Sequence, residues 1–351
     1  MPTPQRPNLF IVGAPKCGTT SVHHYLKQHP DVYMSDKKEP HFFSTDFHLA
    51  SDRLHGEQKF FKVREAGDYA ELFSQAGDAR VIGESSTSYL YSRQAAQNIV
   101  AYSPDARIVI CLRDPFALLR SWHSYLHFCL EEDIPDFRSA LEAEPRRRAA
   151  QGRAGTIPVS AQHPERLYYR EFIRLSEQIE RYTCLFDRAR IHFVVLEELE
   201  REPTSTYTAL LQFLGIPQIL PATFEVRNAR SVRRSSLLST VQRDVIDRLS
   251  RASKPRFLKA VVPAGARRWA YAMLGRTYAT LDKANTVQDG GQDYPVDPLL
   301  ERDLRAELAV EVHAVSGLTG RADLSALWGY EATRTDEAGA QSLTAPQAAT
   351  R

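Results

Sequence analysis

The stretch Leu9-Phe-Ile-Val-Gly13-Ala-Pro15-Lys16-Cys17-Gly18-Thr19-Thr20-Ser21 decides how this chain is built. Its four leading apolar residues, two of them β-branched, predict a short buried strand. Gly13 and Pro15 end that strand, and apolar residues at helical spacing follow from residue 22. The stretch therefore predicts a strand, a tight loop and a helix in succession.

The loop within this stretch has the composition of an anion site. A loop that enters a helix points the free N–H groups of the first turn outward, at the positive end of the helix dipole. One ammonium and three hydroxyls gather at the same point, so phosphate is the expected guest. The candidate binding residues are Lys16, Cys17, Gly18, Thr19, Thr20 and Ser21.

The same loop differs from a nucleotide-kinase P-loop. That pattern is G-x-x-x-x-G-K-[ST], with the lysine directly after the second glycine. Gly13 and Gly18 have the right spacing, but Thr19 stands where the lysine belongs and Lys16 lies inside the loop. An ordinary βα turn without a ligand is the alternative interpretation.

Candidate strands alternate with helical patterns along the chain. Short apolar runs lie at residues 32–34, 81–83, 107–112 and 191–196. This alternation predicts an α/β fold with a P-loop-like central parallel sheet and helices on both faces. Residues 44–67 show little periodicity. Residues 144–166, rich in Arg, Gly and Pro, predict a long loop before a helix over 167–186.

A second candidate site is Arg113-Asp-Pro-Phe-Ala-Leu-Leu-Arg-Ser121, which begins where the strand 107–112 ends. Asp114 and Pro115 suit the N-cap and first position of a helix. A guanidinium at the strand end and the Ser121 hydroxyl eight residues later suit a terminal phosphate. Ligands of parallel sheets bind beyond the carboxyl ends of strands, so we expect Lys16 and Arg113 to face one crevice.

Composition sets broad limits. The 351 residues suffice for one large domain or two small ones, and 43% hydrophobic with 25% charged residues is typical of a globular protein. The net charge of +2 indicates no nucleic-acid partner. Residues 227–276 hold thirteen Lys/Arg against two Asp/Glu. This basic segment could contact an anionic acceptor or a membrane surface, or it could be a solvated or core helix.

Four cysteines, Cys17, Cys111, Cys129 and Cys184, lack metal-ligand spacing, and we expect no metal. All but Cys129 fall in or beside expected core elements, which is typical of reduced thiols in a cytoplasmic protein. The N-terminus lacks the apolar region of a signal peptide, and we expect no transmembrane span. We expect one domain over residues 8–330, with disordered ends at 1–7 and 331–351.

With both anion elements present, the sequence resembles the sulfotransferases that use 3′-phosphoadenosine 5′-phosphosulfate (PAPS). Their 5′-phosphosulfate loop, Pro-Lys-x-Gly-Thr-Thr-Ser, matches residues 15–21, and their 3′-phosphate element matches Arg113 and Ser121. The resemblance covers roughly residues 8–217, with Glu198 as the glutamate of the family's Glu-x-Leu element. It implies PAPS as donor, with Lys16 stabilising the leaving 5′-phosphate. Beyond residue 217 the match weakens, and Arg234 is the candidate phosphate contact there.

A third element, Lys37-Lys38-Glu39-Pro40-His41-Phe42-Phe43, is similar to the Lys-Glu-x-x-Phe-Phe element of carbohydrate sulfotransferases of the heparan type. In those enzymes the glutamate takes the proton from the acceptor, a role that Glu39 inherits. His41 and His123 are rival bases, and a surface Lys-Glu pair beside two buried phenylalanines is the structural alternative. We expect residues 84–89 to line the acceptor side.

The resemblance implies a small-molecule, carbohydrate or glycolipid acceptor whose hydroxyl, rather than amine, is sulfated. A P-loop-type NTP-dependent kinase and a non-catalytic nucleotide-binding protein remain as alternatives. The kinase would need a lysine after Gly18, where the chain has Thr19. The non-catalytic protein would not need Glu39.

Overall fold

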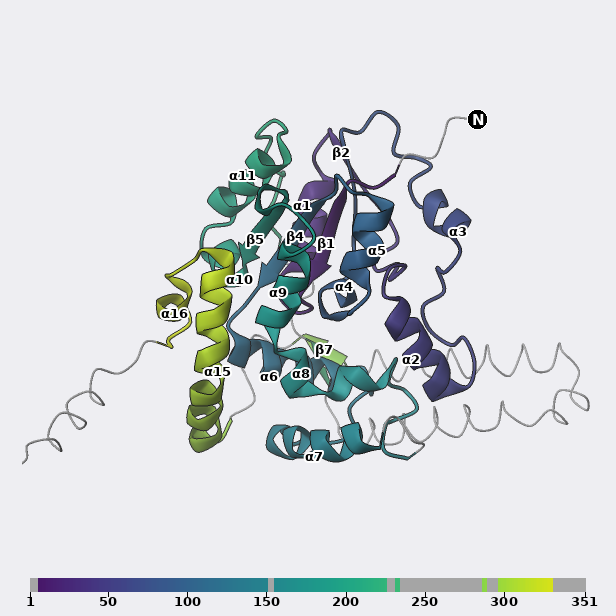
Figure 1. Ribbon diagram of the computed structural model, residues 1–351. Helices are drawn as coiled ribbons and strands as arrows, with labels where there is room; N and C mark the ends of the chain where they lie inside the picture. Colours follow the sequence, from purple (N-terminus) through teal and green to yellow (C-terminus); the bar gives the residue numbers. More distant parts are fainter. Residues whose placement is uncertain (1–5, 151–154, 226–230, 234–285, 289–295, 331–351) are drawn as a thin grey trace, which may run out of the picture.

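The computed structural model describes residues 6–150, 155–225, 231–233, 286–288 and 296–330, with only the backbone for the two three-residue segments. Figure 1 shows a central sheet with helices on both sides. Arg234, most of the basic segment 227–276 and the tail 331–351 lie outside the described residues. Of residues 1–7 the structure describes Arg6 and Pro7.

Five parallel strands form the central sheet. Their order across the sheet is β2 (Val32–Met34), β3 (Val81–Ser85), β1 (Leu9–Gly13), β4 (Arg107–Leu112) and β5 (Ile191–Val195). Every residue of β1 and β3 is buried, as expected for strands covered on both faces. The predicted P-loop-like α/β fold is confirmed. A separate antiparallel pair joins β6 (Ser231–Arg233) to β7 (Thr286–Gln288).

Helices α1 (Thr19–Lys27) and α11 (Pro203–Leu214) lie together on one face of the sheet. Tyr207 of α11 donates its hydroxyl to the carbonyl of Tyr25 of α1 at 3.2 Å, and their rings meet edge to face. This contact buries the apolar side of both helices against the strands.

The opposite face carries α4 (Ser88–Tyr91), α5 (Ala95–Tyr102) and α9 (Leu175–Thr183). The buried Tyr182 hydroxyl of α9 donates to the carbonyl of Tyr89 in α4 at 2.9 Å. From β1 the chain adds β2 and β3 on one side of the sheet and then β4 and β5 on the other, so the strand order reverses between β1 and β4. Parallel sheets bind ligands beyond the carboxyl ends of the strands at such a reversal.

The remaining described elements lie around this core (Figure 1). They are α2 (Thr45–His55), α3 (Ala66–Glu71), α6 (Pro115–Phe128), α7 (Phe137–Ala149), α8 (Tyr169–Phe172), α10 (Leu196–Arg201), α15 (Pro298–Thr319), α16 (Leu324–Leu327) and the 3₁₀ turns Pro164–Leu167 and Arg188–Arg190. Helix α15 contacts both α9 and α6.

Two predictions of local structure were wrong. The expected loop over 144–166 begins inside α7, because the buried Arg147 forms a bidentate pair with the buried Glu132 at 2.6 and 2.7 Å. Such a tertiary ion pair leaves no periodic pattern in the sequence. The expected helix over 167–186 is broken into pieces, because Tyr168 and Arg174 have ψ of 79° and 65°, outside the helical region.

Two further expectations also need correction. Helix α2 occupies much of the stretch 44–67, where little periodicity was visible. Cys184, expected beside the core, is exposed because it follows the last turn of α9. Cys17 and Cys111 are buried as expected.

Candidate active site

The loop after β1 is held in shape by its two glycines. Gly13 has a φ of 140°, and a Cβ there would lie 2.7 Å from the carbonyl oxygen of Thr87. Gly18 has a φ of 80°, and a Cβ there would lie 2.9 Å from Leu196 Cδ1. Both positions demand glycine, because of the left-handed backbone and the lack of room. The loop is thus fitted closely against the segments that follow β3 and β5.

Helix α1 begins at this loop. Gly18 is its N-cap residue and has no side chain to cap the first-turn N–H groups. The side chains of Cys17, Thr19 and Ser21 are buried, whereas Thr20 is partly exposed. Burial raises the pKa of the Cys17 thiol well above its ordinary value, so this side chain stays protonated. Cys17 can therefore offer an anion its backbone N–H rather than its sulfur.

The structure brings the two predicted anion elements together. Strands β1 and β4 are neighbours, and Arg113 directly follows β4. Arg113 Nη1 donates to the carbonyl oxygen of Lys16 at 3.4 Å, a long hydrogen bond that joins the two turns. Ser121 lies partly exposed on α6, two turns further along. The guanidinium and the β1 loop therefore share one edge of the sheet.

The Lys16 ammonium has an aromatic neighbour. Lys16 Nζ lies 5.0 Å from the centroid of the Tyr125 ring, within range of a cation–π interaction. The guanidinium carbon of Arg166 lies 6.0 Å from the same centroid and 4.7 Å from that of Trp122. Arg166 also forms a bidentate pair with Glu131 at 2.6 and 3.0 Å. Two cations thus flank Tyr125, and sequence reasoning had missed Arg166.

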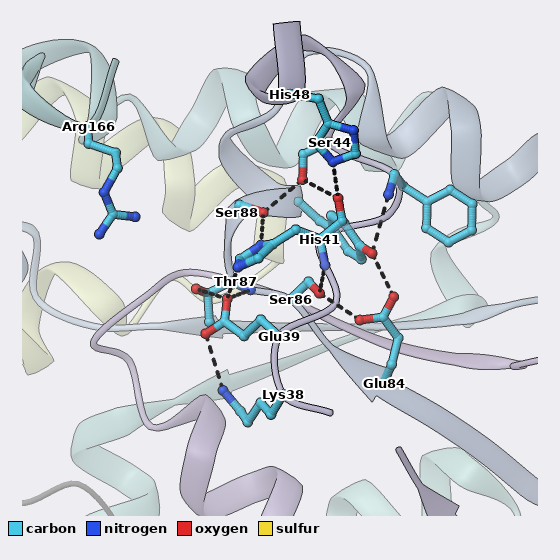
Figure 2. Close-up of polar contacts among 12 residues, drawn as sticks. Lys38, Glu39, His41, Ser44, His48, Glu84, Ser86, Thr87, Ser88 and Arg166 are labelled. Carbon is cyan, nitrogen blue, oxygen red and sulfur yellow. Dashed lines mark hydrogen bonds and ion pairs between the residues drawn. The ribbon is translucent and has the colours of Figure 1, made fainter. Parts of the chain in front are cut away.

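Glu39 lies in a network of hydrogen-bond donors and cations (Figure 2). Its Oε2 accepts hydrogen bonds from the backbone N–H and the hydroxyl of Thr87, both at 2.7 Å. Lys38 Nζ lies 3.4 Å from Oε1, and His41 Nε2 lies 3.6 Å from Oε2. The Thr87 carbonyl oxygen packs closely against Gly13. Thr87 therefore contacts both the Glu39 carboxylate and the β1 loop.

The surroundings of Glu39 favour its ionised form. Burial raises the pKa of this carboxyl, but His41, Lys38 and the two Thr87 hydrogen bonds outweigh it, and the pKa lies below its ordinary value. The side chain keeps 22% of its surface exposed. Glu39 is therefore a carboxylate near neutral pH that can accept a proton from a molecule bound beside it.

His41 is fixed on three sides (Figure 2). Its ring Nδ1 lies 2.7 Å from Ser88 Oγ. Its backbone N–H donates to Ser86 Oγ at 3.0 Å, and its backbone carbonyl oxygen lies 2.7 Å from His48 Nε2. Its φ of 58° places it in the left-handed region. Burial lowers the pKa of His41 to about 4. The imidazole is therefore neutral near pH 7 and lies beside the Glu39 carboxylate.

The rival base His123 has another place. It is buried on α6, its Nε2 lies 3.0 Å from the carbonyl oxygen of Ile134, and its ring packs against Phe137 and Tyr169. These contacts place it between α6 and α7, among apolar neighbours. Of the three candidate bases, Glu39 and His41 lie together and His123 lies apart from them.

Strand β3 carries near its end a buried carboxyl, Glu84, whose supporting role was not recognised from the sequence. Glu84 is fully buried and accepts hydrogen bonds from the hydroxyls of Tyr69, Tyr89 and Ser86 at 2.9, 2.7 and 2.7 Å. Burial raises the pKa of this carboxyl to about 7. The Ser86 hydroxyl oxygen also accepts a hydrogen bond from the backbone N–H of His41. Through Ser86, Glu84 therefore supports the loop that carries Glu39 and His41. The only sequence signal for this role is the run of hydroxyl side chains at residues 85–88.

The described residues include neither a metal-binding cluster nor a membrane-spanning helix. Within that part of the chain, no group of three His, Cys, Asp or Glu side chains is placed to hold a metal ion. Among the described helices, none is both long and apolar enough to cross a membrane.

The chain is similar to known proteins in sequence and in fold. The sequence profile described as "Sulfotransferase family" matches residues 7–220. Mouse heparan sulfate glucosamine 3-O-sulfotransferase 3A1 is 26% identical over 217 residues, 62% of this chain and 47% of that protein. Human carbohydrate sulfotransferase 15 is 30% identical over 165 residues, 37% of this chain and 28% of that protein. The chain thus spans less than half the length of these curated relatives.

A solved structure extends the match. The crystal structure of a sulfotransferase from Alicyclobacillus acidocaldarius has a TM-score of 0.63 and 25% sequence identity. The alignment covers 93% of this chain and 99% of that one.

Proposed function

The chain belongs to the sulfotransferase family, and on that premise we propose that it moves a sulfuryl group from PAPS to a hydroxyl of a carbohydrate, glycolipid or related acceptor. The observation that carries the proposal is the junction of two anion elements, where Arg113 donates to the carbonyl of Lys16 at 3.4 Å. PAPS is a long molecule with a phosphate at one end and a phosphosulfate at the other, and it needs two such elements on one crevice.

In this proposal the β1 loop binds the 5′-phosphosulfate. The first-turn N–H groups of α1 and the hydroxyls of residues 19–21 surround the anion, and Lys16 lies at the oxygen that bridges phosphorus and sulfur. Arg113, together with Ser121, binds the 3′-phosphate. The buried thiol of Cys17 takes no part in this binding.

The transfer breaks one bond and forms one. The acceptor oxygen attacks sulfur, the bond between sulfur and the 5′-phosphate oxygen breaks, and adenosine 3′,5′-bisphosphate leaves. Lys16 stabilises the charge on the departing oxygen, and the acceptor proton passes to Glu39. Such transfers depend on positioning and charge stabilisation rather than on covalent catalysis. The lowered pKa of Glu39 keeps its carboxyl ionised, with an oxygen able to accept that proton.

The proposal of a carbohydrate acceptor is based on the names of the curated relatives. The two curated relatives are named as a heparan sulfate and a carbohydrate sulfotransferase. The Glu39–His41 loop, with its neutral imidazole beside a carboxylate, suits the polar hydroxyls of a sugar. A screen of sugar, glycolipid and amine acceptors with radiolabelled donor would identify the acceptor class.

Thermal unfolding with nucleotides tests the donor. Adenosine 3′,5′-bisphosphate without magnesium should stabilise the folded chain by about 3 kcal/mol at a hundredfold excess over its dissociation constant. At the same concentration adenosine 5′-monophosphate should stabilise it less, because it offers Arg113 no 3′-phosphate. The Arg113→Ala variant should lose this difference. Stabilisation by magnesium-ATP in place of the bisphosphate would favour the kinase and overturn the proposal.

A further inference from the structure

The turn that carries Arg113 is held by a part of the chain far away in sequence. The Asp114 carboxylate caps α6, since Oδ1 accepts from the N–H of Phe116 at 3.1 Å. The same Oδ1 accepts from the Tyr330 hydroxyl at 3.0 Å, and Oδ2 accepts from Arg305 Nη2 at 3.3 Å. Two of the three groups on this carboxylate therefore come from residues 298–330, outside the 7–220 region that matches the family.

The backbone of the same turn is held from a second direction. The Asp114 N–H donates to Glu197 Oε1 at 3.0 Å, and Glu197 Oε2 accepts from Trp328 Nε1 at 3.1 Å. The neighbouring Glu198, which the family resemblance singled out, pairs instead with Arg321 at 2.5 and 3.2 Å. Helix α10 thus lies between the Arg113–Asp114 turn and the C-terminal segment.

The segment that makes these contacts is itself firmly packed. Leu304, Leu308 and Val312 of α15 are buried, and Trp328 keeps only 4% of its surface exposed. Arg305 lies 4.9 Å from the ring centroid of Phe116 and donates Nη1 to the carbonyl of Trp328 at 3.1 Å. Figure 1 shows α15 and α16 running beside α10 and α6. A rigid segment of this kind can fix the position of what it touches.

We propose that residues 298–330 form part of the donor site, with Arg305, Trp328 and Tyr330 as positioning residues for the 3′-phosphate. The inference rests on the proposed function. The contacts hold both the N–H and the carboxylate of Asp114, so the peptide that joins it to Arg113 cannot turn. Because the arginine side chain is long and flexible, fixing its backbone narrows the positions that its guanidinium reaches. The segment therefore sets the affinity of Arg113 for the phosphate without touching it.

A pair of nucleotides separates this role from a merely structural one. Adenosine 3′,5′-bisphosphate and adenosine 5′-monophosphate differ only in the 3′-phosphate, so their affinity ratio reports on the groups that bind this phosphate, Arg113 and Ser121. Loss of general stability would weaken both nucleotides alike. Loss of positioning would weaken the bisphosphate and leave the monophosphate unchanged.

The test uses the full chain with Tyr330→Phe, which removes one hydroxyl and keeps the ring, and Arg305→Gln, which removes the charge. Isothermal titration should show the bisphosphate bound about 2- to 10-fold more weakly by each variant, the loss expected for one hydrogen bond. The monophosphate should bind as to the wild type. Arg302→Gln is the matched control, since Arg302 lies 73% exposed on the same helix and contacts Asp303. It should change neither affinity.

Several results would overturn the inference. Equal weakening of both nucleotides, or no change in Tyr330→Phe, would mean that the segment only stabilises the fold. If Arg305→Gln does not fold, Tyr330→Phe decides alone, because Phe retains the packing of the ring. Failure of the proposed function would look different, since the wild type itself would then bind the two nucleotides equally.

Discussion

The two halves of the proposed site, one for the donor and one for the acceptor, are built in different ways. The donor half consists of backbone N–H groups, two glycines and the cations that follow β1 and β4. The acceptor half consists of side chains that hold each other across two loops, as when Thr87 donates twice to Glu39 and Ser88 meets His41. The β1 loop and the Arg113 turn are each shaped by their local backbone before they meet at the sheet edge, whereas the acceptor half exists only when the side chains of two loops meet.

This difference predicts how each half responds to substitution. A backbone site depends on the charges beside it and on the shape of its loop, while a side-chain network has several members that can fail separately.

The sharpest change in the acceptor half is Glu39→Gln, which keeps the shape of the side chain and removes the base. Turnover should fall by about 10²- to 10⁴-fold, the usual contribution of a general base. Bisphosphate affinity should remain, because the donor half does not use this carboxylate. Steady-state kinetics with titration calorimetry would measure both, and the exposed Glu57→Gln provides the control. Unchanged turnover would transfer the role of base to His41.

In the donor half, Lys16→Ala removes the charge beside the leaving oxygen. We expect turnover to fall by about 10²- to 10³-fold with the fold intact, as for the loss of one electrostatic contact in other transition states. Single-turnover kinetics would measure the step, with the exposed Lys37→Ala as the matched control. A variant that loses only donor affinity and keeps its turnover would contradict a role at the leaving oxygen.

The pH dependence of stability probes the network beneath the acceptor half. Burial raises the pKa of Glu84 to about 7, so the folded chain holds a proton that the unfolded chain releases above pH 4.5. The contribution of this residue to the free energy of unfolding is full below pH 4.5 and falls by roughly 3 kcal/mol as pH rises through 7. His41 acts in the opposite sense, because its pKa of about 4 makes its contribution grow between pH 4 and 6.5.

Urea unfolding of the wild type and Glu84→Gln from pH 4.5 to 7.5 separates the two residues. The stability of the wild type relative to the variant should decline with rising pH, because only the wild type carries the titrating carboxyl. Parallel curves would show that Glu84 does not titrate in this range.

The smallest effect should come from the shape of the donor loop. Gly18→Ala places a methyl group 2.9 Å from Leu196 Cδ1 at a φ of 80°, and we expect a loss of about 1–3 kcal/mol of folding stability. Gly67→Ala is the matched control, because Gly67 lies in α3 with open space around it. That change should leave stability equal or raise it slightly. If both variants are equally stable, the donor loop does not depend on glycine at this position.

The sequence alone determined the features that are built from contiguous residues. The buried runs of β1, β4 and β5, the glycine spacing of the β1 loop and the Arg-Asp-Pro turn are contiguous. Their structure is set by local backbone preference and by the polar end of a helix. These features predicted the parallel sheet and the meeting of Lys16 with Arg113. The role predicted for Glu39 came instead from the resemblance of its short motif to that of carbohydrate sulfotransferases, and it stays a prediction.

Tertiary structure decided what depends on partners distant in the sequence. The pairing of Arg147 with Glu132 turned an expected loop into helix α7, and three hydroxyls made Glu84 a support of the site. Residues 298–330 carry no recognisable motif, yet Tyr330 reaches Asp114 across the fold. Hydrogen bonds and ion pairs of this kind need only two groups within about 3 Å, and that proximity is set by the folded chain as a whole.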